Sequence, residues 1–273
     1  MRNTIRTALF TLSTAILLVV LVTSCMSLSH NLRYTVPQKR TTAPVDAFVL
    51  VEVEEEMIPA TCVSSSPGID CDRLLKELPT STKSWSGSGL MVMSDTGPSI
   101  LTAAHVCEKD TPDSFVYKEV KITILTAIRI RVHSPLKGTY NASIMRTDVE
   151  KDLCLLRPET IFTYPVTISQ KSPQIGDKVY AISAPYGISG KNLALVFNGF
   201  FSGSGEDMKF YTIPTRPGSS GSVVMNEDWE VIGVLHTAFR DLENVGMGTG
   251  LSDVTSFLFS PVETIVVKPL IQP

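Results

Sequence analysis

The chain has 273 residues, of which 43% are hydrophobic and 19% charged, so it can bury a core and does not belong to the disordered class. The chain has 24 basic and 27 acidic residues, a formal net charge of −3. All five charged side chains among the first 45 residues are basic. Residues 46–273 therefore hold 19 basic and 27 acidic side chains, a net charge of −8. This acidic balance argues against nucleic acid binding, and the 17 Gly and 17 Pro, scattered without a period, exclude collagen-like and coiled-coil architectures.

The N-terminus has the pattern of an export signal. Arg2 and Arg6 precede residues 7–24, an 18-residue stretch without a charge. As a helix this stretch is about 27 Å long, close to the ~30 Å hydrocarbon core of a bilayer, so a retained anchor helix is an alternative to a cleaved signal. In either case residues 1–24 place the rest of the chain outside the cytoplasm, in the cell envelope.

The residues that follow predict a membrane tether. Val-Thr-Ser-Cys at residues 22–25 resembles the lipobox of bacterial lipoproteins, and this resemblance makes Cys25 the expected lipidation site. Residues 25–44 then form a flexible tether in front of the folded domain. The expected membrane contact is made through this N-terminal lipid or through the anchor helix.

Four cysteines remain if Cys25 carries lipid, and an even number in an exported protein favours two disulfides. Cys62 and Cys71 flank a segment with Pro-Gly turn chemistry, so this pair is expected to bond. Cys107 and Cys154 form the second pair, partly by elimination, and the alternative for them is two buried free thiols.

Strands dominate the predicted secondary structure. The predicted strands are rich in β-branched or aromatic residues and cover residues 47–53, 89–93, 99–101, 116–132, 179–183 and 193–197. Helix signals are few and cover residues 72–78, 103–108 and 254–259. Many short strands favour closed or paired sheets, because open edges invite aggregation, and two small packed barrels suit this length.

Three motifs follow one another along the chain. The first is Thr-Ala-Ala-His at residues 102–105, after an apolar strand, and the second is a charged turn that ends in Asp152 and opens another apolar strand. The third is Gly-Ser-Ser-Gly-Ser at residues 218–222, which leads into a strand hairpin. Each motif alone has an ordinary structural explanation, so their combination and order carry the argument.

Together the motifs resemble those of trypsin-like serine peptidases, and the pattern is similar to bacterial glutamyl endopeptidases and HtrA-type proteases over residues 85–251. The resemblance implies an all-β, chymotrypsin-like fold of two packed six-stranded antiparallel β-barrels with few short helices. It places a peptidase domain at residues 45–273, with the N-terminal barrel at about 45–165 and the C-terminal barrel at about 166–262.

The resemblance also assigns chemistry to the motifs. A serine hydroxyl needs a base to become a nucleophile, and the base in turn needs a carboxylate that orients it. These roles fall to Ser220, His105 and Asp152, with Asp148 as the alternative acid, and the backbone N–H groups of Gly218 and Ser220 are the expected oxyanion hole. The order His, Asp, Ser separates this pattern from α/β-hydrolases.

The primary substrate pocket is expected at Thr215, His236 and Thr237, again by resemblance. Thr215 and His236 are similar to the residues with which glutamyl endopeptidases hold an acidic side chain, although His236 lies one residue later than that pattern suggests. Because Pro214 stands where an acid would select Lys or Arg, trypsin-like specificity is not supported. His133, in a long strand with alternating Arg, is expected to be exposed.

The predicted function is that of an exported, membrane-tethered serine endopeptidase, which hydrolyses protein or peptide substrates through an acyl-enzyme. No metal-ligand spacing and no phosphate-binding glycine loop is present, so no metal and no cofactor are expected. One alternative is a catalytically inactive homologue that acts as an envelope binding module. Another is an anchored β-domain whose motifs match by accident.

Overall fold

The computed structural model describes residues 40–64, 69–108, 112–117, 119–239 and 242–259. The expected export signal, Cys25 and nearly all of the tether lie outside these residues. All of the described residues belong to one unit that begins at Lys39. Among the residues that the structure describes, no helix is long and apolar enough to cross a membrane.

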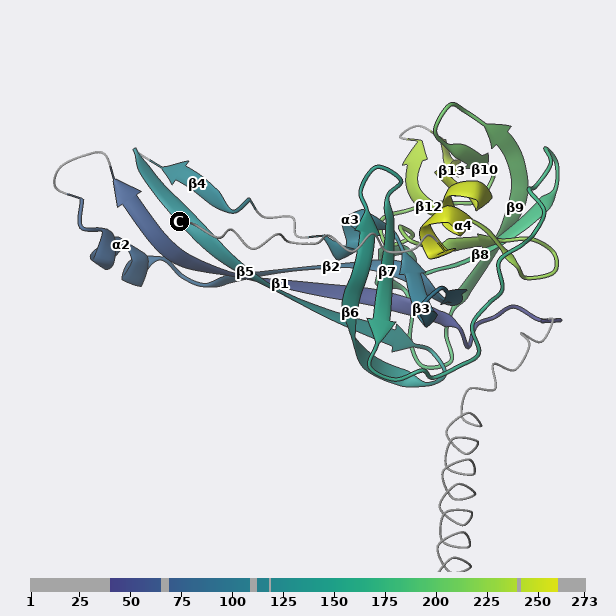
Figure 1. Ribbon diagram of the computed structural model, residues 1–273, viewed down its shortest axis with the longest axis horizontal. Helices are drawn as coiled ribbons and strands as arrows, with labels where there is room; N and C mark the ends of the chain where they lie inside the picture. The colour runs from purple at the N-terminus through teal and green to yellow at the C-terminus, as the bar shows by residue number, and fades with distance from the viewer. Residues whose placement is uncertain (1–39, 65–68, 109–111, 118, 240–241, 260–273) are drawn as a thin grey trace, which may run out of the picture. The chain divides into compact units, whose positions relative to one another are not determined.

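Strands make up most of the described chain and fall into an N-terminal and a C-terminal set (Figure 1). The N-terminal set is β1 (Phe48–Ser64), β2 (Ser81–Ser94), β3 (Gly97–Thr102), β4 (Ser114–Tyr117), β5 (Val120–Ser134), β6 (Gly138–Asp148) and β7 (Leu153–Pro158). The C-terminal set is β8 (Lys178–Ser183), β9 (Leu195–Ser204), β10 (Lys209–Tyr211), β11 (Val223–Met225), β12 (Val231–Phe239) and β13 (Leu242–Gly250).

Each set forms its own antiparallel sheet. The C-terminal strands close into a six-stranded barrel in the order β10-β13-β12-β11-β8-β9. The N-terminal strands form a seven-stranded sheet in the order β1-β2-β3-β7-β6-β5-β4, which an additional pairing between β1 and β5 turns into a ring. The predicted chymotrypsin-like, all-β fold is confirmed, with the difference that β4 extends the N-terminal ring beyond six strands. The exact domain boundaries stay a prediction.

Three of the four helices among the described residues lie close to where the sequence predicts them, and the 3₁₀ helix η2 (Pro185–Gly187) was not predicted. The other three are α2 (Cys71–Glu77), α3 (Ala104–Cys107) and α4 (Leu251–Phe259). The side chain of Asp70 caps α2 by accepting a hydrogen bond from the backbone N–H of Arg73 at 3.1 Å. Arg146 of β6 donates to the Leu258 carbonyl at 3.0 Å, which ties α4 to the N-terminal sheet.

The larger of two hydrophobic clusters joins the two sheets. Met91 and Leu155 of the N-terminal sheet belong to the same buried cluster as Ile182 and Val223 of the C-terminal barrel and Val254 of α4. Burial of such apolar surface stabilises the packing of the sheets on each other by about 25 cal/mol per Å². A smaller cluster around Tyr211 fills the inside of the C-terminal barrel.

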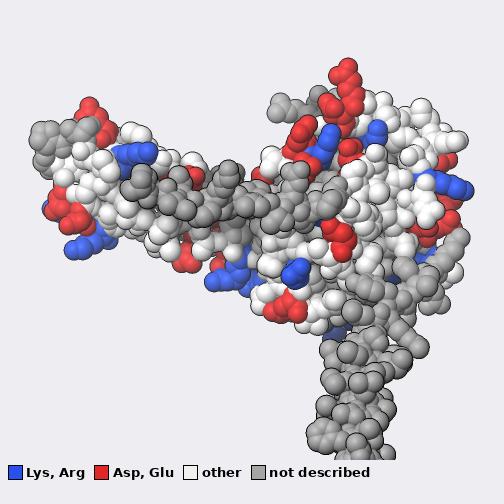
Figure 2. All heavy atoms as spheres, in the orientation of Figure 1, with Lys and Arg blue, Asp and Glu red and all other residues white. Residues whose placement is uncertain are grey.

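The ladder between β1 and β5 is longer than the sequence suggests. It continues from Leu50↔His133 to Ser64↔Val120, past the acidic residues at which the predicted strand 47–53 stops. Arg129 and Arg131 of β5 form ion pairs with Glu54 and Glu52 of β1 at 2.9 and 3.2 Å. Such cross-strand pairs make a polar strand compatible with the sheet. On the face of the molecule drawn in Figure 2, charged side chains of both signs are interspersed.

Both predicted disulfides are present. Cys62, near the end of β1, bonds to Cys71 at the start of α2, with a Cα–Cα distance of 5.5 Å. Cys107 bonds to Cys154, so the alternative of two buried free thiols is wrong.

Candidate active site

The pairing of β3 with β7 brings two of the predicted site residues together. In this antiparallel register Thr102, the last residue of β3, lies opposite Cys154 near the start of β7. The segment that leaves β3 toward His105 therefore runs beside the segment that enters β7 from Asp152. The Cys107–Cys154 disulfide joins the same two segments.

His105 and Asp152 make two hydrogen bonds with each other. The Nδ1 atom of His105 lies 2.7 Å from Asp152 Oδ2, and the backbone N–H of His105 donates to Asp152 Oδ1 at 2.9 Å. Asp152 has a left-handed backbone (φ 51°), which an Asp tolerates better than most residues. Asp148 instead accepts from the Lys151 N–H at 2.9 Å and so stabilises the turn before Asp152. Asp152, and not Asp148, is the acid beside His105.

The surroundings of Asp152 favour its ionised form. Burial raises the pKa of this carboxyl, but the hydrogen bonds from the side chain and backbone of His105, with the charges of His105 and His236, outweigh it. The net effect is a pKa below the ordinary 3.8. The side chain of His105 is 49% exposed, so the ring contacts a carboxylate on one edge while solvent reaches the ring.

Ser220 is held at the same place by the N-terminal sheet. Its carbonyl accepts from the Ser88 N–H at 2.7 Å. A Cβ at Gly87 would lie 2.6 Å from Val106 Cγ2 and 2.9 Å from Ser220 O, so this glycine lets the serine backbone approach the residue after His105. The Ser220 hydroxyl lies 3.5 Å from the His236 carbonyl, and among the described residues no hydrogen bond joins it to the ring of His105. Catalytic hydrogen bonds are often long in unliganded structures and tighten with substrate.

As far as the structure describes the chain, the backbone around Ser220 leaves two N–H donors without an acceptor. Ser219, Gly221 and Ser222 donate their N–H groups to carbonyls of the chain, at distances from 2.7 to 3.0 Å. Within the described part of the chain, the N–H groups of Gly218 and Ser220 have no acceptor. Two neighbouring unpaired amides can bind an oxyanion without reorganisation.

Gly218 meets a steric requirement as well as a conformational one. Its φ is +91°, and a Cβ there would lie 2.5 Å from the Ala184 carbonyl oxygen and 2.9 Å from the Tyr186 nitrogen. Ser88 holds Gly218 at its carbonyl, in the 218–219 peptide, because its buried hydroxyl donates to the Gly218 carbonyl at 2.8 Å and accepts from the Ala184 N–H at 2.9 Å. Sequence reasoning did not give Ser88 this role.

The expected pocket residues lie in different environments. Thr215 is buried and donates to the Ile213 carbonyl at 3.1 Å, and a Cβ at Gly246 would lie 2.4 Å from its hydroxyl oxygen. Thr237 pairs with Met247 across β12 and β13. The role of these threonines in substrate binding stays a prediction.

His236 contacts the acid. Its Nδ1 lies 3.4 Å from Asp152 Oδ2, and its Nε2 lies 3.2 Å from the hydroxyl oxygen of Thr249. Its position in the sequence resembled that of a pocket residue and gave no signal for this contact.

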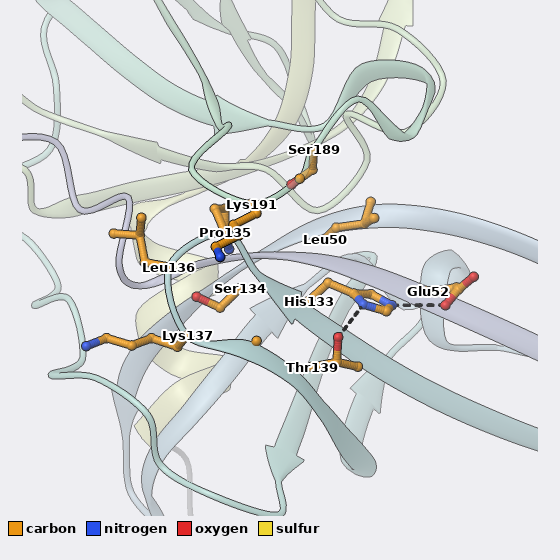
Figure 3. Close-up of a pocket in the computed structure, with 12 residues that line it drawn as sticks. Leu50, Glu52, His133, Ser134, Pro135, Leu136, Lys137, Thr139, Ser189 and Lys191 are labelled. Atoms are coloured by element: carbon orange, nitrogen blue, oxygen red, sulfur yellow. Dashed lines mark hydrogen bonds and ion pairs between the residues drawn. The ribbon is translucent and has the colours of Figure 1, made fainter.

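A separate cavity of about 560 Å³ lies where the β5–β6 turn meets residues 189–191 (Figure 3). His133 lines it, half-buried, with Nε2 2.9 Å from a Glu52 carboxylate oxygen and Nδ1 2.9 Å from the Thr139 hydroxyl. The expectation that this side chain is exposed is therefore wrong, because the cross-strand Glu52 holds the ring against the sheet.

Among the described residues, no group of three or more His, Cys, Asp or Glu side chains is placed to hold a metal ion.

A family model described as a trypsin-like peptidase domain matches residues 87–234, which include His105, Asp152 and Ser220. The chain belongs to this family. Among solved structures, the trypsin-like fold is similar to a serine endoprotease from Yersinia pestis, with 23% identity and a TM-score of 0.53. The match covers 80% of this chain and 62% of the Yersinia chain, and at this identity it shows the fold alone. No curated protein matches the chain.

Proposed function

We propose that the chain is a serine endopeptidase that works with His105, Asp152 and Ser220. The observation that carries the proposal is the two-bond contact between His105 and Asp152, beside a loop whose Gly218 and Ser220 amides are unpaired within the described residues. Membership of the trypsin-like peptidase family supports the same reaction class and implies protein or peptide substrates.

In the proposed mechanism, Ser220 Oγ attacks the carbonyl carbon of the scissile peptide bond while its proton passes to Nε2 of His105. Asp152 stays ionised and stabilises the imidazolium. The amides of Gly218 and Ser220 bind the oxyanion of the tetrahedral intermediate. His105 then returns the proton to the leaving amine, and water releases the acyl group by the same steps in reverse.

Covalent labelling tests this proposal directly. The full-length chain is expected to react with a fluorophosphonate probe and to cleave members of a peptide library, whereas Ser220→Ala does neither. Ser189→Ala is the matched control, because this hydroxyl lies in another loop and donates only a long bond, at 3.4 Å, to the Leu193 carbonyl. Equal cleavage by the wild type and Ser220→Ala would remove Ser220 from the mechanism. Absence of labelling in a folded wild type would favour the inactive binding module.

The substrate preference is proposed to depend on Thr215 and Thr237. Thr215 is buried next to Gly246, so a substrate side chain would meet small and hydroxyl-bearing residues there. No acid stands at position 214, and the same peptide library is therefore expected to show no enrichment of Lys or Arg before the cleaved bond.

We also propose that the peptidase is exported and held at a membrane. The support is the sequence of residues 1–25, with two arginines, an uncharged stretch and Cys25. Cys25→Ala is expected to move the protein from the membrane fraction to the soluble fraction if the anchor is a lipid, and to leave it in the membrane if residues 7–24 are a retained helix. A soluble wild type would contradict both forms of the anchor.

A further inference from the structure

A β-bulge places His236 beside Asp152. In the ladder between β12 and β13, Leu235 pairs with Gly248 and Thr237 pairs with Met247, so His236 is the extra residue of its strand. A bulge bends the strand and re-aims its side chains. The His236 side chain is only 10% exposed, and both of its ring nitrogens face oxygen atoms.

The two oxygens restrict the protons of the ring. Asp152 Oδ2, 3.4 Å from Nδ1, accepts hydrogen bonds and donates none when it is ionised. The Thr249 hydroxyl donates to the Lys151 carbonyl at 2.5 Å, so it acts as an acceptor toward Nε2 at 3.2 Å. The doubly protonated ring satisfies both contacts at once. A neutral ring with its proton on Nδ1 keeps the contact to Asp152 while the Thr249 hydroxyl turns to Nε2.

We propose that His236 is a positioning residue of the peptidase, a second imidazole on Asp152 that steadies the carboxylate when neutral and opposes proton transfer to His105 when charged. The inference rests on the proposed function, because it concerns the acid of the proposed triad. It differs from the expected role of His236 as a wall of the substrate pocket.

Few charged groups surround this ring. Among the described residues, Asp152, from the segment before β7, and His105 of α3 interact electrostatically with it, whereas the β13 contact is the uncharged Thr249. The ammonium group of Lys151 lies 3.8 Å from Asp253 of α4 and is engaged there. Burial lowers the pKa of His236, Asp152 raises it and His105 lowers it, with a net pKa below the ordinary 6.5. The ring of His236 therefore gains its charge at a lower pH than an ordinary histidine does.

The charged form would act against the reaction. Transfer of the Ser220 proton turns His105 into a cation on the carboxylate that His236 already contacts. Two cations then share one carboxylate, and their repulsion in a partly buried site raises the barrier. Full activity therefore requires both rings to be neutral, so two ionisations should reduce the rate on the acidic side.

Two substitutions separate this role from simple packing. His236→Asn keeps an N–H donor at about the place of Nδ1 but does not titrate, whereas His236→Leu keeps the volume without a donor. We expect kcat to fall by about threefold in the Asn variant and about tenfold in the Leu variant, with KM within about twofold. On the acidic side, log kcat/KM of the wild type is expected to approach a slope of two against pH, and that of both variants a slope of one. Circular dichroism at each pH controls for unfolding.

A wild-type slope of one, matched by both variants, would overturn the proposal, and so would equal kcat values for Asn and Leu. Histidine ¹⁵N NMR of the full-length chain gives a readout that needs no activity. Asp152→Asn is expected to move the titration of His236 about one pH unit lower, because the carboxylate charge is lost. An unmoved His236 titration would also overturn the proposal. If the wild type showed no peptidase activity but Asp152→Asn still moved the titration of His236, only the proposed function would be rejected.

Discussion

Cys107 and Cys154 form a disulfide, and each lies two residues after one member of the His105–Asp152 pair. The disulfide thus links the two segments that carry the proposed catalytic pair. It does so where the β3–β7 register already aligns these segments. Trp85 adds a third constraint, because its indole N–H donates to the Val106 carbonyl at 2.9 Å and holds the turn of α3. The site is therefore fixed mainly by the N-terminal sheet, to which the Ser220 loop docks.

Removing this disulfide should cost both stability and activity. For Cys107→Ala with Cys154→Ala, whose sequence separation is 47, the chain-entropy model gives a loss of about 4 kcal/mol in the free energy of unfolding. Peptide hydrolysis is expected to fall at least about tenfold at a temperature where the variant is folded, since the two segments are less restrained. Urea unfolding and hydrolysis of a library-derived peptide measure the two effects.

The matched control removes the other disulfide. Cys62→Ala with Cys71→Ala opens a loop with a separation of 9, so about 2–3 kcal/mol is expected to be lost, with hydrolysis unchanged. If both double variants changed hydrolysis to the same degree, the Cys107–Cys154 bond would have no special role in the site.

Gly218→Ala tests the proposed oxyanion hole. The added methyl group would lie 2.5 Å from the backbone oxygen of Ala184, so the backbone at residue 218 must shift. The Gly218 N–H then no longer points at the position of the oxyanion. We expect kcat to fall by about 10²- to 10³-fold, as for loss of an oxyanion donor, with KM changed little. Gly176→Ala is the control for the backbone alone, because Gly176 has φ +94° and nothing within 4 Å of a built Cβ. Comparable losses in both variants would assign the effect to strain and not to the oxyanion donor.

Ser88→Ala tests whether the N-terminal sheet positions Gly218 through its carbonyl. The substitution leaves the Gly218 carbonyl and the Ala184 N–H without their side-chain partner, which costs about 1–3 kcal/mol of stability and should lower kcat about tenfold. Ser94→Ala removes another buried hydroxyl, which donates to the Gly97 carbonyl at 2.8 Å away from the site. A similar loss of stability with normal kcat is expected there. Normal kcat in a folded Ser88→Ala would contradict the positioning role.

The sequence predicts the site residues better than it predicts the sheets around them. The residue types of the three motifs and their order along the chain point to His105 and Asp152, and these two side chains are in contact in the structure. Strand β6 (Gly138–Asp148) escaped prediction because its polar, partly exposed residues lack the β-branched and aromatic enrichment used to find strands. Its place depends on pairing with β5 and β7, which lie before and after it in the chain.

Two further features depend on register and not on residue type. The contact of His236 with Asp152 follows from one extra residue between Leu235 and Thr237, and a bulge of this kind has no sequence signature here. The role of Ser88 follows from the docking of the Ser220 loop on β2, at a sequence distance of 130 residues from Gly218. The contact of His236 and the role of Ser88 both depend on packing between residues far apart in the chain, so a local sequence pattern cannot predict them.

The first described residues are fastened to the fold by a carboxylate whose contribution should depend on pH. Arg40 donates to Asp46 at 2.6 Å and to the Tyr164 carbonyl at 2.7 Å, and the Thr163 hydroxyl also donates to Asp46. Burial raises the pKa of Asp46, but the hydrogen bonds from Arg40 and Thr163 outweigh it and hold the pKa below the ordinary 3.8. The unfolded chain lacks these donors and binds a proton more readily.

A carboxyl with a lowered pKa in the folded state adds stability above its unfolded pKa, and this stability is lost as the pH falls through the folded pKa. Asp46→Asn is therefore expected to unfold about 1–2 kcal/mol more easily than the wild type at pH 7, with the difference shrinking below about pH 4. Urea titrations at pH 7, 5 and 3 measure it. Asp207→Asn, at an exposed site between β9 and β10, should change stability by less than about 0.5 kcal/mol at pH 7. A constant difference between wild type and Asp46→Asn at all three pH values would show that the carboxylate charge does not hold this segment.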